Sequence, residues 1–126
     1  MIFITLSKVI YFGKGKIYMY HKENNSWVNI KVFTCDIGAP DSPTIEGNFN
    51  SGLKGKYLKI NETYVKYFTQ ISGNYLFHSV TYNEKGQVID GRLGEAVSHG
   101  CVRLSLENAK YIYDIIPART GIKIIK

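Results

Sequence analysis

The sequence predicts a mainly β domain, a β-sandwich or mixed sheet with one short helix near its C-terminal end. Short runs of alternating apolar and polar residues, separated by turn-forming residues, occupy most of the chain. Residues that favour strands are frequent, with 10 Tyr, 6 Phe and 1 Trp. A convincing helical pattern occurs in one segment alone, after Ser105.

The N-terminal half predicts strands joined by tight turns. These strands are residues 2–6, 16–21, 27–33 and 47–50. The turn residues at 23–26 predict that the second and third of these strands form a hairpin. Glycine and two prolines in segment 38–43 predict a loop before the fourth strand.

The C-terminal half continues the β pattern. Its predicted strands are residues 56–60 and 64–71, which could form one strand or two, then residues 74–82, 87–89 and 121–125. Alternation within 74–82 puts Leu76, His78, Val80 and Tyr82 on one face. The turn residues 83–86 predict a hairpin after this strand.

The helix has both a start signal and a stop signal. Ser105 is a suitable N-cap, and Glu107 lies in the first turn, where the helix dipole favours an anion. Pro117 ends the helix. The apolar residues at helical spacing are Ala109, Ile112, Tyr113 and Ile116.

Size and charge bound the function. The 126 residues suffice for one domain, residues 1–126, with a hydrophobic core. The net charge of +6 favours anionic surroundings, but the lysines are scattered, so a basic surface is favoured over a nucleic-acid site. No apolar run is long enough for a membrane helix, and no membrane contact is predicted.

The N-terminal residues lack the basic region and cleavage site of a signal peptide. The sequence is also compatible with a domain cut from a longer exported protein. Of the two cysteines, Cys35 ends a strand-like run and is predicted to be a core residue. We therefore expect no disulfide bond between Cys35 and Cys101.

Residues 98–101, Ser-His-Gly-Cys, form the most informative motif. Cys101 follows a polar, glycine-containing turn, which is poor material for a core, so a nucleophile is favoured over a buried structural cysteine. Gly100 allows a positive φ, and the N–H groups of Gly100 and Cys101 could stabilise an oxyanion. His99 could polarise the turn or shape the same oxyanion site.

His78 is the candidate general base. A histidine on an apolar strand face is usually a satisfied core residue, but a candidate nucleophile elsewhere favours a catalytic role. One ring nitrogen would accept the thiol proton, and the other needs an acceptor, for which a backbone carbonyl near Ser79 is available. His21, on an exposed hairpin, is given no role.

Arg103 leaves three interpretations open. It could lower the thiol pKa, clamp a substrate carboxylate, or form a salt bridge that holds the turn. A zinc site made by Cys101, His99 and His78 is a weaker alternative, because no second cysteine pair supports it. We therefore predict no metal at this site, and we expect Ser79, Ser98 and Arg103 to contact the substrate.

His78 followed by residues 98–103 resembles the signature of the L,D-transpeptidase catalytic domain family. Residues 34–38, 41–49 and 90–94 are similar to supporting segments of the family, and the likeness covers residues 16–126. The resemblance implies a bacterial peptidoglycan enzyme that forms 3→3 cross-links between stem peptides through a Cys101 thioester, with His78 as base.

The resemblance also implies a reaction that needs no metal or organic cofactor, a location outside the cytoplasm, in the cell wall, and inhibition by β-lactams of the carbapenem class. Two alternatives remain open. One is a cysteine hydrolase, a peptidoglycan carboxypeptidase or endopeptidase, in which water replaces the acceptor amine. The other is a non-catalytic wall-binding domain.

Overall fold

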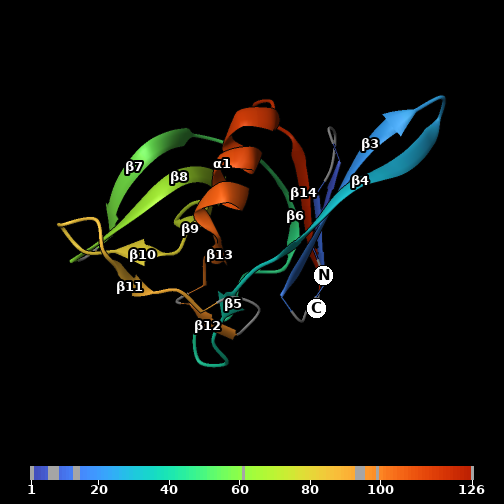
Figure 1. Cartoon of the computed structure of the whole chain (residues 1–126). Coiled ribbons are helices and arrows are strands. Elements are labelled where there is room, and N and C mark those ends of the chain that lie inside the picture. Colours follow the sequence, from blue (N-terminus) through green and yellow to red (C-terminus); the bar gives the residue numbers. More distant parts are fainter. Residues whose placement is uncertain are drawn as a thin grey trace.

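The computed structural model describes residues 2–5, 9–12, 15–60, 62–92, 96–98 and 100–125. Strands dominate this part of the chain, which holds a single helix (Figure 1). The predicted mainly β fold with one C-terminal helix is confirmed. Over the same residues, no helix has the length and apolar character needed to cross a membrane.

The first sheet joins the two ends of the described chain. Its strands are Ile2–Thr5 (β1), Val9–Phe12 (β2), Lys16–Glu23 (β3), Ser26–Thr34 (β4), Gly47–Asn50 (β6) and Gly121–Ile125 (β14). Their order is β4-β3-β1-β2-β14-β6. The sheet is mixed, because β1 is parallel to β3 and β14 is parallel to β2, whereas the other pairs are antiparallel.

The second sheet carries the candidate site. Its strands are Lys54–Ile60 (β7), Thr63–Ser72 (β8), Tyr75–Ser79 (β9), Thr81–Tyr82 (β10), Val88–Asp90 (β11) and Val102–Leu104 (β13). β8 pairs with β7 along one edge and with β9 and β10 along the other. A small parallel pair, Ile37–Gly38 (β5) with Ala96–Ser98 (β12), completes the strands.

The core lies between the two sheets and the helix Leu106–Ile115 (α1), which packs on β8, β9 and β13. The first sheet contributes Ile17, Met19, Phe33, Ile122 and Ile124; the second contributes Ile71, Phe77, Val102 and Leu104; the helix segment contributes Ala109, Ile112 and Ile116. Cys35 is fully buried with them and is not in a disulfide bond, as predicted.

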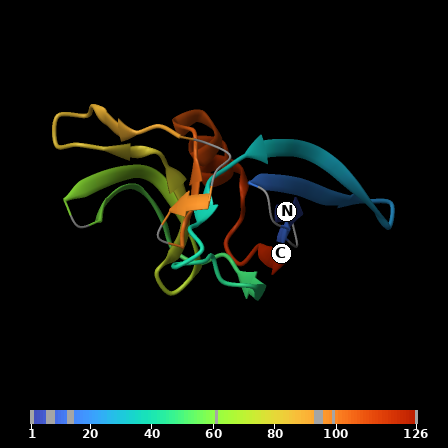
Figure 2. The same cartoon turned by 90° about the horizontal axis from the view of Figure 1, so that it is seen from below.

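Local sequence signals explain several elements. The hydroxyl of Ser105 accepts a hydrogen bond from the Asn108 N–H, the predicted helix cap. Asn24 and Asn25 take positive φ angles of 46° and 64°, which matches the twist of the β3–β4 hairpin. Seen from below, this hairpin and the β7–β8 hairpin extend to opposite sides of the molecule (Figure 2).

Two parts of the strand prediction differ from the structure. The predicted strand 74–82 is broken at Val80, so it forms β9 and β10. At this break the Ser79 hydroxyl accepts a hydrogen bond from the Lys66 N–H and donates one to the Val80 carbonyl. A side chain therefore takes the place of a ladder hydrogen bond. The strands β2, β5, β12 and β13 were not among those predicted.

Candidate active site

His78 lies on the face of β9 that points away from the core cluster. Its side chain is buried, and its Nδ1 is 2.6 Å from the Ser79 carbonyl oxygen. A carbonyl can only accept, so Nδ1 carries the proton and Nε2 carries the lone pair. The sequence-based prediction of a backbone acceptor near Ser79 is therefore confirmed.

Burial keeps the His78 imidazole neutral. It lowers the pKa of His78 from 6.5 to about 4; the hydrogen bond to the Ser79 carbonyl opposes the shift, and the charge of Arg103 adds to it. At neutral pH the ring is therefore unprotonated, which is the form that a general base requires.

Cys101 directly precedes β13, beside the histidine strand. β13 runs parallel to β9, with Val102 opposite Phe77 and Arg103 opposite His78. Cys101 therefore enters the sheet about one strand spacing, roughly 4.8 Å, from β9. The pairing brings together the cysteine and histidine segments that the sequence separates by more than twenty residues.

The Cys101 thiol is half-buried and donates a hydrogen bond to the Asn74 carbonyl oxygen at 3.4 Å. Burial raises the pKa of this thiol, and a hydrogen bond with the Leu76 backbone offsets part of the rise. The resting thiol is therefore protonated at neutral pH, so it needs a base to become a nucleophile.

Gly100 has the backbone conformation expected of a glycine-dependent turn. It is buried and has a φ of 112°, which L-residues with a side chain rarely adopt. A Cβ atom at this position would lie 2.8 Å from the ring of Tyr75. Both the conformation and the space therefore require glycine directly before Cys101.

Arg103 is in a buried ion pair. Its side chain is 7% exposed, and its Nε donates to a carboxylate oxygen of the fully buried Asp36. The backbones of the same two residues exchange two hydrogen bonds, of 2.7 and 3.0 Å. Of the three interpretations of Arg103, the structure favours the salt bridge that holds the turn.

The ion pair extends to the surface. Arg103 Nη2 is 3.5 Å from an Asp90 carboxylate oxygen, which is 2.7 Å from Arg92 Nη2. The hydrogen bonds from Arg92 hold the pKa of Asp90 far below its usual range. Asp36 was not among the predicted site residues; its signal is a charged residue within the mostly apolar segment 32–37.

Three further residues were predicted to belong to the site: Ser79, Ser98 and His99. The Ser79 side chain is fully buried and engaged at the β9–β10 break, which favours a structural role for that hydroxyl. Ser98 ends β12, whose backbone pairs with β5 at Gly38. His99 lies outside the described residues. No group of three or more His, Cys, Asp or Glu side chains that could hold a metal ion occurs within the described part of the chain.

The sequence pattern of the L,D-transpeptidase catalytic domain family matches residues 7–124. A stretch of 55 residues is 42% identical to YciB of Bacillus subtilis (strain 168), whose name assigns it to the L,D-transpeptidases; the match covers 41% of this chain and 28% of YciB.

Solved structures share the fold. One is a fused Zn-dependent amidase/peptidase/peptidoglycan-binding domain-containing protein from Clostridium acetobutylicum ATCC 824, with 43% identity, a TM-score of 0.75, and 98% of this chain and 50% of that chain covered. Another is the L,D-transpeptidase LdtMt1 in complex with imipenem, with 17% identity, a TM-score of 0.70, and 98% and 58% covered.

The chain thus spans about a quarter to three fifths of the length of these relatives. The family's sequence pattern extends over nearly the whole of it. The chain belongs to the L,D-transpeptidase catalytic domain family.

Proposed function

We propose that this domain is a peptidoglycan L,D-transpeptidase that forms 3→3 cross-links through a thioester on Cys101. The observation that carries the proposal is the His78 imidazole, buried and neutral, with Nδ1–H on the Ser79 carbonyl and its strand paired to the segment that follows Cys101. Its Nε2 lone pair is the base that the protonated thiol requires.

In the first half-reaction, His78 Nε2 takes the Cys101 proton and the sulfur attacks the carbonyl carbon that follows the L-centre of the donor's diamino acid. The N–H groups of Gly100 and Cys101 stabilise the oxyanion. The carbon–nitrogen bond to the terminal D-alanine then breaks, and His78 returns the proton to the leaving amine. A thioester and free D-alanine result.

In the second half-reaction, the side-chain amine of an acceptor stem attacks the thioester carbonyl. His78 removes a proton from this amine, the carbon–sulfur bond breaks, and the proton returns to the sulfur. The product is an amide link between two diamino acids. The reaction places the domain outside the cytoplasm, in the cell wall, where the +6 charge suits anionic surroundings.

The test uses a disaccharide-tetrapeptide with the purified protein. We expect cross-linked dimer and released D-alanine, identified by mass spectrometry. Tripeptide without dimer would instead establish the hydrolase, and neither product would indicate a wall-binding domain.

A carbapenem provides a second readout of the nucleophile, since the related LdtMt1 structure holds imipenem. We expect one adduct per chain by intact mass, and none with Cys101→Ala while its circular dichroism spectrum stays that of the parent protein. An adduct of undiminished yield on Cys101→Ala would contradict the assignment of the nucleophile.

A further inference from the structure

The sheet face that carries His78 continues across β8. Thr69 lies opposite Phe77 of β9, and Tyr64 lies opposite Tyr82 of β10, so both strands keep one register against β8 on either side of their break. Side chains alternate between the two faces of a strand. The even-numbered residues of β8 therefore lie on the same face as His78.

This face carries a cluster of lysines and tyrosines from β7, β8 and β10. We call it the lysine–tyrosine face, and it consists of Tyr57, Lys59, Tyr64, Lys66 and Tyr82. Tyr57 is paired with Lys66 across β7 and β8, and Lys59 with Tyr64. The Lys66 ammonium lies 4.6 Å from the ring centroid of Tyr82 and 6.0 Å from that of Tyr57. The Lys59 ammonium lies 5.8 Å from the Tyr64 ring.

The two lysines are positioned but not neutralised. Within the described residues, neither Lys59 nor Lys66 is in an ion pair, whereas Lys110 on the helix surface has Asp114 at 2.7 Å. Tyr57, beside Lys66, is 68% exposed. Tyr82, whose ring lies nearest to the Lys66 ammonium, is buried, and Lys59 is exposed. The cluster therefore offers two cations without an ion-pair partner among the described residues, one at the surface and one half-buried against aromatic rings, which complements an anionic ligand.

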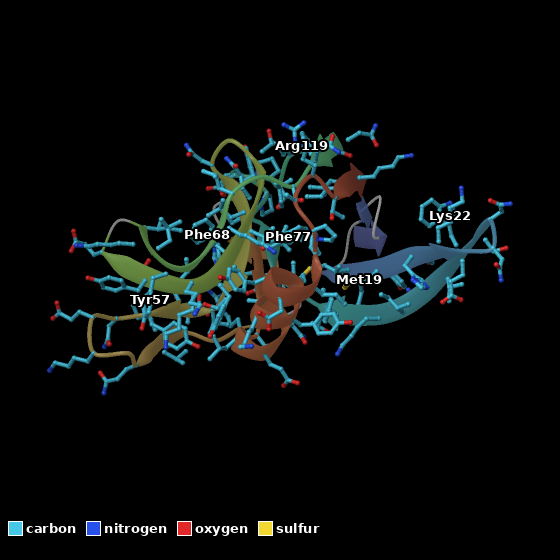
Figure 3. All side chains as sticks on the ribbon, turned by 90° about the horizontal axis from the view of Figure 1, so that it is seen from above. Met19, Lys22, Tyr57, Phe68, Phe77 and Arg119 are labelled. Atoms are coloured by element: carbon cyan, nitrogen blue, oxygen red, sulfur yellow. The ribbon has the colours of Figure 1, made fainter. Side chains whose placement is uncertain are left out.

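The distance between His78 and Lys66 is one that a short extended peptide can span. The register puts Lys66 beside Val80, one strand across and two residues along from His78. These steps correspond to roughly 5 and 7 Å, so the two backbones are about 8 Å apart. An extended peptide covers that distance in two to three residues. Figure 3 shows Tyr57 of β7 and Phe68 of β8 at one end of the molecule and Lys22 at the other.

We propose that the lysine–tyrosine face binds free carboxylates of the stem peptide, so that the domain selects stem peptides with free carboxyl groups over amidated ones. This inference rests on the proposed function, which supplies the stem peptide as substrate. Carboxylates fit the two ammonium groups, whereas a carboxamide carries no charge and loses that attraction.

The experiment measures binding to the Cys101→Ala protein, which cannot consume the ligand. Two disaccharide-tetrapeptides are compared by calorimetry, identical except that the carboxyl groups of the glutamate and diamino residues are free in one and amidated in the other. We expect the free acid to bind about fivefold more tightly, as two partly exposed charge pairs allow. The preference should decrease as salt is raised.

Two lysine variants separate this face from general basicity. Combined with Cys101→Ala, Lys59→Gln with Lys66→Gln should remove the preference. Lys22→Gln is the matched control, because Lys22 also lies over an aromatic ring, that of Trp27 at 5.7 Å, but on the opposite hairpin. The control should keep the preference.

Equal binding of the two peptides, no binding of either, or an unchanged preference in the double lysine variant would overturn the proposal. A loss of preference in Lys22→Gln as well would reduce it to general charge attraction and also overturn it. If the free acid is preferred but the wild-type protein forms no product, the proposed reaction fails and the recognition of free carboxylates stands.

Discussion

At the scale of single residues, loss of the His78 side chain should cost far more activity than loss of His21. General base catalysis typically contributes about 10²- to 10⁴-fold. We expect His78→Gln to slow carbapenem acylation by at least about tenfold, followed by intact mass over time. His21→Ala is the control, since His21 contacts Glu23 on the β3–β4 hairpin, and it should acylate normally. Wild-type acylation by His78→Gln would make His99 the first alternative base.

Gly100 should tolerate no side chain. Gly100→Ala combines a backbone at φ 112° with a Cβ atom 2.8 Å from the Tyr75 ring, so the turn must move. We expect acylation to fall by about tenfold or more, because the Gly100 and Cys101 N–H groups, which we propose stabilise the oxyanion, move with the turn. Gly86→Ala is the control. Gly86 also has a positive φ, of 79°, but an added Cβ atom there would meet nothing within 4 Å, so this variant should acylate normally.

Residue-scale features were predictable where the partners are close in sequence. The Ser79 carbonyl is adjacent to His78, Ser105 caps its own helix, and the positive φ of Gly100 follows from its place in the turn. Asp36 was not predictable as the partner of Arg103, because 67 residues separate them. The pairing depends on the sheet arrangement, which local patterns do not specify.

At the scale of elements, the ion pair of Asp36 and Arg103 joins the segment before β5 to β13. Removing one partner of a buried pair leaves an uncompensated charge and typically costs about 3–5 kcal/mol. We expect Asp36→Asn to lower the free energy of unfolding by about that amount, measured with urea. Asp114→Asn removes the exposed pair with Lys110 and should change it by less than about 0.5 kcal/mol.

A change below about 1 kcal/mol in the free energy of unfolding of Asp36→Asn would contradict the role given to this pair.

Element predictions from sequence succeeded for the β3–β4 hairpin and for α1, which have their own turn and cap residues. They failed for the short strands β5, β12 and β13, which have three residues at most. Strands this short carry no periodicity, and only their pairing partners define them.

At the scale of the whole molecule, His78 makes folding stability depend on pH. Its pKa is about 4 in the folded protein against 6.5 ordinarily, so the unfolded chain binds more protons between these values. Stability should therefore fall as pH decreases from 6.5 to 4, by about 3 kcal/mol from this group. In urea unfolding at pH 7 and pH 4.5, we expect His78→Gln to lose less stability than the parent. Equal losses in both proteins would mean that His78 is not buried in its neutral form.

The position of β14 has a consequence for how the chain reaches its native state. β14 is the last of the described strands in sequence, yet it lies between β2 and β6 in the first sheet. β6 therefore has no partner in that sheet until residues 121–125 are available. A chain emerging vectorially, from a ribosome or through a translocation channel, cannot complete this sheet until residues 121–125 have emerged. Closure of the domain is thus a late, long-range event, of the kind that slows folding.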